Sequence, residues 1–270
     1  MIALAVASQK GGVGKTTVCL NLAHALARRG WNTLVVDTDP QGGVGLSLSR
    51  TTRQRRGFLD FITGGTEARS YILPTRLPEF SIMPVGQTNA LENLGAHLLD
   101  LAPIRLRELL RQLDLLRYDC VILDTAAGLT GLTECVVRGA DFVMVPQQAE
   151  PLAVRSLPLM LETLARFRAE GSPIRVAGIL LTMLQNDHEA SLQVAREIQQ
   201  MLPPQLMLTP SVPRDPLFLE ASALGLPVSL VRKNPPPAAL LFDQLAAELE
   251  ERTGLAAQKE NTYTHATLLD

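Results

Sequence analysis

Residues 9–17 read Gln-Lys-Gly-Gly-Val-Gly-Lys-Thr-Thr and connect a short apolar run, residues 2–7, to a helix that we expect over residues 15–29. Glycines allow such a loop to turn tightly, so that successive backbone N–H groups point into one concavity. The amino end of the following helix adds partial positive charge, and the combined site favours phosphate. Lys15 is expected to contact the β- and γ-phosphates of a nucleotide, and the Thr16 hydroxyl to bind Mg²⁺. The loop thus restricts the chain to folds in which a strand, a loop and a helix follow one another.

The rest of the chain alternates short apolar runs with helical periods. Of the 270 residues, 46% are hydrophobic and 4% are aromatic, so the core must be mainly aliphatic. Strands that alternate with helices favour an α/β fold with a doubly wound, mainly parallel sheet flanked by helices. Further strands are expected at residues 33–36, 81–84, 120–123, 142–145 and 175–182, and further helices at 104–117, 151–170, 189–201 and 238–252.

Proline and glycine mark the less regular parts of this pattern. Residues 41–78 contain few helical or strand periods and are predicted to be rich in loops. Pro158 lies inside the helix expected over residues 151–170, and we expect it to break that helix. We predict a single domain over residues 1–254 and a flexible tail over residues 255–270.

The charge balance and the cysteines exclude several classes of protein. Lys and Arg number 25 and Asp and Glu 27, so the net charge of −2 lacks the basic excess of a protein that coats nucleic acid permanently. Cys19, Cys120 and Cys135 form no C-x-x-C motif, which argues against a zinc site or a disulfide framework and favours a reducing cytosol. We expect Cys120 and Cys135 to be buried structural thiols. No apolar stretch approaches about 18 residues, so no transmembrane helix is expected.

Two further strands end in carboxylates. Residues 35–42 read Val-Val-Asp-Thr-Asp-Pro-Gln-Gly, so that Asp37 closes one strand and Asp39 follows it. Residues 118–124 form an apolar strand that ends in Asp124. Open α/β sheets place ligands at the carboxyl ends of their strands, so these carboxylates are expected beside the phosphates. Taken alone, the Asp-Thr-Asp-Pro segment is also compatible with a turn that only caps a strand.

The phosphate loop departs from the standard motif, because Gln9 stands where glycine is usual and a second lysine, Lys10, opens the loop. From the residues alone Lys10 could be an exposed loop charge. The sequence K-G-G-V-G-K-T resembles the deviant Walker A box of the ParA/MinD family of ATPases. That resemblance implies that Lys10 reaches across a nucleotide-sandwich dimer to the phosphates of the partner. The ATP-binding residues that it implies are Lys10, Gly11, Gly12, Val13, Gly14, Lys15, Thr16 and Thr17.

The two acidic segments resemble the other motifs of the same family. Residues 37–42, D-T-D-P-Q-G, are similar to its switch box, and residues 118–128 are similar to its Walker B strand. The resemblance implies that Asp39 orients the attacking water and, with Lys10 and Lys15, is catalytic. The magnesium set that it implies is Thr16, Asp37 and Asp124. After Asp124 the residues Thr-Ala-Ala-Gly are nearer to MinD proteins than to ParA proteins.

The carboxyl half favours the ParA branch, close to the Soj-like partition ATPases. The segments that carry this resemblance are residues 145–153, 180–184 and 212–227. It implies that Pro213 packs against the adenine ring. The helix expected over residues 238–252 is amphipathic but acidic, with Glu248, Glu250 and Glu251 expected on its solvent side. Anionic lipid would repel such a helix, so we expect it to pack on the core and expect no stable membrane association.

The family resemblance implies a slow ATPase that uses ATP and Mg²⁺, dimerises with ATP, binds nucleoid DNA non-specifically and positions a chromosome, a plasmid or a protein assembly. It implies stimulation by a ParB-like or cargo-adaptor protein and a cytoplasmic, nucleoid-associated location. DNA contacts are expected from Arg196, Arg214, Arg232 and Lys233. Asn186 and Leu217 stand where many ParA proteins carry arginine, and the Arg-rich residues 50–56 are more typical of a solvated loop. Two alternatives remain: a MinD-like regulator that acts through protein or membrane contacts, and a P-loop ligase of small molecules.

Overall fold

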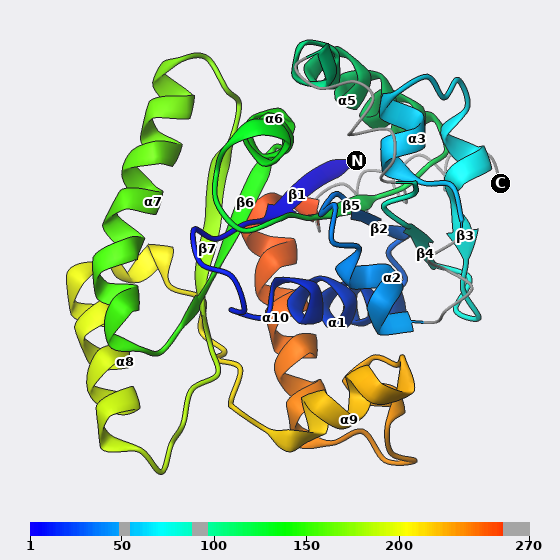
Figure 1. Cartoon of the computed structure of the whole chain (residues 1–270). Helices are drawn as coiled ribbons and strands as arrows, with labels where there is room; N and C mark the ends of the chain where they lie inside the picture. The colour runs from blue at the N-terminus through cyan, green and yellow to red at the C-terminus, as the bar shows by residue number, and fades with distance from the viewer. Residues whose placement is uncertain (49–54, 88–96, 256–270) are drawn as a thin grey trace, which may run out of the picture.

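The computed structural model describes residues 1–48, 55–87 and 97–255. Within these ranges seven strands form a sheet in the order β3-β4-β2-β5-β1-β6-β7, in which only β3 is antiparallel (Figure 1). The strands are β1 (Ile2–Val6), β2 (Thr33–Asp37), β3 (Leu73–Pro74), β4 (Phe80–Met83), β5 (Cys120–Asp124), β6 (Phe142–Gln148) and β7 (Arg175–Thr182). The prediction of a doubly wound, mainly parallel sheet is confirmed.

Helices cover both faces of this sheet. The helices in the described residues are α1 (Lys15–Arg28), α2 (Gly43–Leu48), α3 (Phe58–Ile62), α5 (His97–Leu115), α6 (Gly131–Gly139), α7 (Pro151–Ala169), α8 (Glu189–Met201), α9 (Pro216–Leu224) and α10 (Pro237–Thr253), with short 3-10 turns η2 (Ala68–Tyr71), η3 (Pro204–Leu206) and η4 (Val228–Leu230). Helices α1, α2, α9 and α10 contribute to one apolar cluster, and α3, α5, α6, α7 and α8 to the other (Figure 1).

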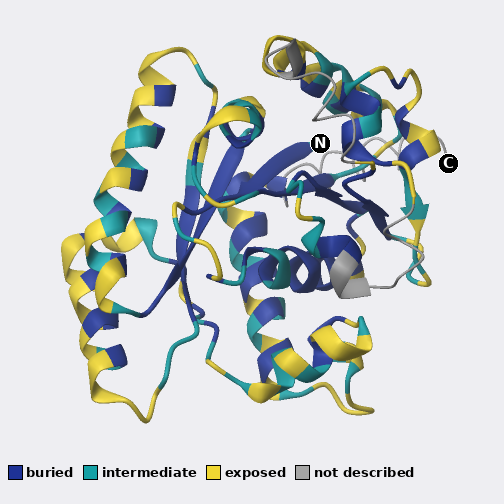
Figure 2. Cartoon of the chain, viewed as in Figure 1, coloured by how far each residue is buried: buried dark blue, intermediate teal, exposed yellow. Residues whose placement is uncertain are grey.

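The strands supply both clusters because their side chains alternate between the faces. In β1, Ala3 and Ala5 face one cluster while Leu4 and Val6 face the other. The central strands are buried along their length, as expected for a parallel sheet covered on both sides (Figure 2). A ligand site is therefore expected in the loops at the carboxyl ends of the strands, where polar groups can reach a ligand.

Several helices differ from the prediction. Helix α5 begins at His97 rather than at residue 104 and contains Pro103. Helix α7 continues through Pro158, so the predicted break is wrong. Buried side chains on both sides of this proline, such as Ala153 and Met160, pack in one cluster and hold both halves of the helix in place. The segment predicted to be rich in loops contains α2 and α3.

The last helix packs on the core, as predicted, through buried residues such as Phe242 and Leu245. The expected solvent exposure of Glu250 is wrong, because this residue is buried. Its carboxylate accepts hydrogen bonds from Trp31 Nε1 at 2.7 Å and Arg29 Nη2 at 2.8 Å. Buried carboxylates are tolerated when donors satisfy both oxygens, and here the donors follow α1, so the contact ties α10 to α1.

Other expectations concern single residues and the chain as a whole. Cys120 is buried and Cys135 is half-buried, and both are free thiols. In the described ranges no helix combines the length and the apolar character needed to span a membrane. The predicted tail, from residue 256 onward, and the Arg-rich residues 50–54 lie outside the described residues.

Candidate nucleotide and metal site

The glycine-rich loop lies between the end of β1 and the start of α1, beside the carboxyl ends of β5 and β6. Gly12 has a φ of 73° and Gly14 a φ of 87°, and Gly14 is the amino cap of α1. A side chain would be strained in this left-handed conformation, so the loop requires glycine at both positions. Gly11 lies close to the chain after β5, where an added Cβ would be 3.8 Å from the Cβ of Ala127.

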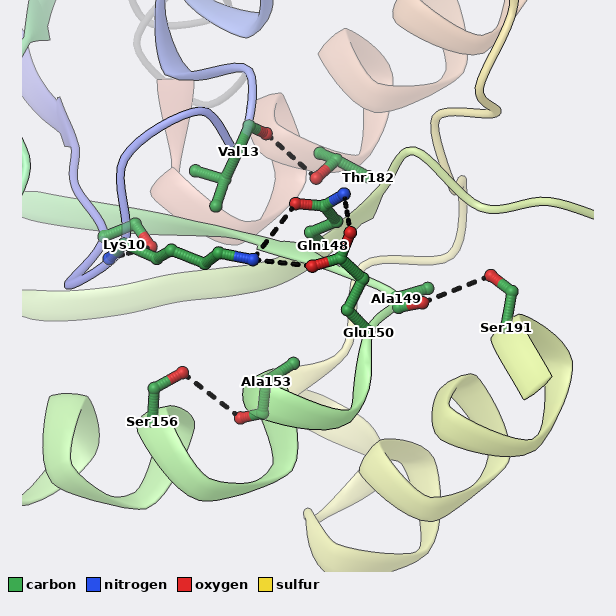
Figure 3. A network of polar contacts seen from close by, with 10 residues as sticks. Lys10, Val13, Gln148, Ala149, Glu150, Ala153, Ser156, Thr182 and Ser191 are labelled. Atoms are coloured by element: carbon green, nitrogen blue, oxygen red, sulfur yellow. Dashed lines mark hydrogen bonds and ion pairs between the residues drawn. The ribbon is translucent and has the colours of Figure 1, made fainter.

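Two hydrogen bonds hold the loop from either side. The Thr182 hydroxyl, at the end of β7, donates to the carbonyl of Val13 at 2.9 Å (Figure 3). The backbone N–H of Gly128 donates to the carbonyl of Ser8 at 3.0 Å. Both contacts come from segments that are distant in sequence, so the sheet fixes the shape of the loop.

The two lysines of the loop differ in their surroundings. Lys15 begins α1 and is only 8% exposed. Lys10 lies on the β6 side, where its Nζ is 2.6 Å from Glu150 Oε2 and 3.5 Å from Gln148 Oε1 (Figure 3). Lys10 is therefore held by side chains of its own chain, whereas Lys15 is enclosed at the amino end of α1.

The acidic residues meet at the ends of β2 and β5, as predicted. Asp37 and Asp124 are paired in the register of these strands. Thr16 Oγ1 donates to Asp124 Oδ2 at 2.7 Å. The hydroxyl of Thr38 donates to the carbonyl of Asp124 at 2.7 Å, and the Thr38 N–H donates to the same carbonyl at 2.9 Å. These bonds bring the three predicted metal-binding residues to one place.

Asp37 and Asp39 are oriented by the chain that follows them. Asp37 Oδ1 accepts the N–H of Asp39 at 3.2 Å, and its Oδ2 accepts the N–H of Val44, in the first turn of α2, at 3.0 Å. Asp39 is half-buried, and its Oδ1 accepts the N–H of Gln41 at 2.9 Å. The carboxylates thus have fixed directions at the edge of the loop.

Burial raises the pKa values of two carboxyl groups in this site. It raises the pKa of Asp37 to about 8, and the neighbouring Asp124 adds to the effect. Burial also raises the pKa of Asp124 to about 6, although hydrogen bonds from Thr16 and Cys19 oppose the rise. Two adjacent buried carboxylates are costly unless a cation or a proton neutralises them.

The donor set fits Mg²⁺. Carboxylate and hydroxyl oxygens are the ligands that this ion prefers, and it binds through one or two carboxylates together with phosphates and water. No group of three or more His, Cys, Asp and Glu in the described part of the chain is arranged to hold a metal by itself. Asp37, Asp124 and Thr16 therefore suit an ion that arrives with a nucleotide.

The nucleotide-free protein is expected to become less stable as the pH rises from about 4 to about 8. Asp37 and Asp124 have higher pKa values when folded, and together these two carboxyls outweigh His24, whose pKa burial lowers to about 4, so the folded state binds more protons than the unfolded state in this range. Raising the pH removes that advantage, and the free energy of unfolding falls. Asp37→Asn should flatten this dependence in urea denaturation at a series of pH values, whereas the exposed Asp187→Asn should not. A steep profile retained by Asp37→Asn would contradict the prediction.

A cavity of about 340 Å³ lies beside the loop. Its lining includes Thr17 from α1, Met183 after β7, and Pro213 and Phe218 from the segment that enters α9. The Pro213 segment is joined to the end of β7, because Arg214 N donates to the carbonyl of Leu184 at 2.9 Å. A mainly apolar cavity next to a phosphate loop suits the flat ring of a base.

Some residues of this site were not predicted. Met183 and Phe218 line the cavity, and Gln148 and Glu150 hold Lys10. All four lie inside segments that carry the family resemblance, residues 145–153, 180–184 and 212–227, but the sequence assigned no role to these individual side chains. Met183 has a φ of 52°, a value that no local pattern predicts.

The four predicted DNA contacts are not brought together. Arg196 lies on α8 and pairs with Glu189 at 3.5 Å. The other three are exposed residues on or near α9 and η4, namely Arg214, Arg232 and Lys233. Helix α8 packs on the sheet face opposite to that of α9 and α10 (Figure 1). Arg232 pairs with Glu220, so part of this positive charge is already neutralised.

Two similar proteins of known name are both described as chromosome-partitioning proteins. A family model described as an AAA domain matches residues 1–175. The chain is 34% identical over 257 residues to the chromosome-partitioning ATPase Soj of Thermus thermophilus. The alignment covers 92% of this chain and 95% of that protein. The chain is 32% identical over 231 residues to the chromosome partitioning protein ParA of Caulobacter vibrioides, with 84% and 86% covered. The chain belongs to the ParA/MinD family of ATPases.

A solved enzyme structure has a similar fold. It is described as cobyrinic acid a,c-diamide synthase from Mycobacterium smegmatis with bound ADP and magnesium. It is 26% identical to this chain, with a TM-score of 0.76, and covers 94% of this chain and 96% of its own. As a member of the ParA/MinD family the chain is an ATPase.

Proposed function

We propose that the chain is an ATP-dependent dimerisation switch that binds nucleoid DNA non-specifically and positions a cargo. Residues 1–254 form its single ATPase domain. The observation that carries the proposal is the division of the loop lysines, with Lys15 enclosed beside Thr16 and Asp124, and Lys10 on the outer side of the loop. One lysine then serves the nucleotide of its own subunit, and the other, once it leaves Glu150, serves that of a second subunit.

The chemistry needs positioning and charge neutralisation more than covalent catalysis. Lys15 and the backbone N–H groups of residues 11–17 bind the phosphates of ATP, and the cavity beside Pro213 takes the adenine. Thr16, Asp37 and Asp124 hold Mg²⁺, which when bound supplies positive charge at the phosphates. Asp39, oriented by the N–H of Gln41, positions the water that attacks. Lys10 of a second subunit completes the charge around the phosphates, so slow hydrolysis depends on dimerisation.

The names of the relatives support a role in partitioning, since both are described as chromosome-partitioning proteins. In the proposed cycle the ATP dimer binds DNA through Arg214, Arg232 and Lys233, with Arg196 as a separate contact. A ParB-like or cargo-adaptor protein stimulates hydrolysis, and the dimer then releases the DNA. Such a protein acts in the cytoplasm on the nucleoid.

A mobility-shift experiment on DNA of arbitrary sequence tests this proposal. The protein should retard DNA with ATP and Mg²⁺ but not with ADP or without nucleotide. Affinity should fall as salt rises from about 50 to 200 mM, because contacts to phosphates release counterions. Arg214→Ala should weaken binding for all sequences alike, whereas Arg76→Ala, in the exposed turn between β3 and β4, should not. No shift with ATP at low salt would rule out the nucleoid model and leave the MinD-like alternative.

A ligase of small molecules is the second candidate, favoured by the description of the Mycobacterium smegmatis structure as a synthase. The two candidates differ in how hydrolysis depends on protein concentration. A dimerisation switch should show a specific activity that rises with protein concentration, since two chains form each active unit. A ligase would hydrolyse ATP at a rate per chain that does not change with concentration and would need its small-molecule substrate.

A further inference from the structure

Lys10 is held by two acceptors from one short segment of its own chain. Its Nζ lies 2.6 Å from Glu150 Oε2 and 3.5 Å from Gln148 Oε1. The amide Nε2 of Gln148 donates to the other oxygen of Glu150, which aims the Gln148 carbonyl oxygen at Lys10 (Figure 3). The lysine, the glutamine and the glutamate thus form a closed triangle of polar contacts.

The acceptor side of this triangle is rigid. Gln148 is the last residue of β6 and is buried, and Glu150 is the amino cap of α7. Between them, Ala149 donates its N–H to the carbonyl of Thr182 at 3.1 Å. The carbonyl of Ala149 accepts the Ser191 hydroxyl at 3.2 Å (Figure 3). Strand β7 and helix α8 therefore fix this segment, whereas Lys10 has a long flexible side chain.

We propose that Glu150 and Gln148 form a latch that holds Lys10 inside its own subunit and that ATP-dependent pairing of two subunits has to open. The latch rests on the proposed function, in which Lys10 serves the phosphates of a second subunit. An ammonium group that lies 2.6 Å from its own glutamate has to leave that contact to reach another molecule. Glu150 is then a positioning residue, because it acts through Lys10.

The strength of the contact suits a latch that can open. The side chains of Lys10 and Glu150 are 29% and 40% exposed, and ion pairs that solvent reaches are weak. The three phosphates of ATP offer Lys10 more negative charge than a single half-exposed carboxylate. ADP lacks the terminal phosphate and offers less. The latch therefore favours pairing of two subunits that hold ATP over pairing of two subunits that hold ADP.

The test is the dissociation constant of the dimer, measured by sedimentation equilibrium with Mg²⁺ and a non-hydrolysable ATP analogue. Glu150→Gln removes the charge and keeps the shape, and we expect it to tighten the dimer by about fivefold to twentyfold, since a weak pair is lost in each of two subunits. Glu150→Asp, which retracts the carboxylate by one methylene, should tighten it less. Glu170→Gln is the matched control, because Glu170 is the carboxyl cap of the same helix and pairs with Arg138 instead. Thermal melting shows whether each variant is folded.

A double variant separates the latch from simple charge repulsion between subunits. Lys10→Ala/Glu150→Gln should stay as monomeric as Lys10→Ala, because the latch acts only through Lys10. A double variant that dimerises, or a Glu150→Gln dimer no tighter than that of the parent, would overturn the latch. Failure of the proposed function appears elsewhere, as a parent protein that stays monomeric with the analogue or as a Lys10→Ala variant that dimerises like the parent. Either result would overturn the latch together with the function on which it rests.

Discussion

Replacing Lys15 with alanine is expected to abolish binding of Mg-ATP, raising the dissociation constant by at least about 100-fold. Lys15 is 8% exposed at the amino end of α1, and its charge lowers the pKa of Asp124. Losing a charge-assisted contact to phosphate in such a position costs about 3 kcal/mol or more, and each 1.4 kcal/mol is about tenfold in affinity. The buried carboxylate of Asp124 would also lose a neighbouring positive charge.

Isothermal titration calorimetry of each purified variant with Mg-ATP measures the effect of the Lys15 replacement. Arg76→Ala removes a positive charge from an exposed turn and should bind within about twofold of the parent. Thermal melting of Lys15→Ala without nucleotide checks that the loop variant is folded. An affinity within about threefold of the parent would show that Lys15 does not bind the phosphates.

The second large effect is expected for Lys10→Ala. Nucleotide binding to the monomer should change by no more than a few-fold, because Lys10 points to Gln148 and Glu150 rather than into the enclosed part of the loop. The ATP-dependent dimer should be lost. Hydrolysis should fall with it, since a cation supplied to the transition state by a partner is worth about 10³–10⁵ in rate in well-studied nucleotide hydrolases.

The measurement for Lys10→Ala is the rate of ATP hydrolysis per chain over a range of protein concentrations, together with sedimentation of each sample. The hydrolysis rate per chain of the parent should rise with protein concentration to a plateau. The rate of the variant should stay low at every concentration. Normal dimerisation and a normal plateau in the variant would contradict a role for Lys10 across the dimer.

The regular parts of the fold could be predicted because local patterns determine them. Strand β7 and helix α8 have the predicted bounds, since a continuous apolar run marks the strand and a helical period marks the helix. Helix α2 was not predicted, because its first turn depends on Asp37 accepting the N–H of Val44. That contact is a property of the folded edge of the sheet and leaves no repeating pattern in the sequence.

The predicted and the unpredicted residues of the site differ in how far apart their contacts lie in the sequence. The glycines, Lys15, Thr16 and Asp124 follow from a short motif and from strand ends, so the structure brings them together as expected. The partner of Lys10 is Glu150, 140 positions along the chain, and the partner of Trp31 is Glu250, 219 positions along the chain. Pairs at such separations depend on how the helices pack, and a single sequence carries no record of that packing.

Thr38 holds the carbonyl of Asp124 with both its hydroxyl and its N–H, so the metal side of the site is built before any ligand arrives. In the proposed function, the lysine side is completed only by a second molecule. A protein built in this way behaves as a coincidence detector, which reports the nucleotide only when a neighbour is also present. Below the dissociation constant of the dimer, its output then scales with the square of its local concentration, so that differences in abundance from place to place become larger differences in activity.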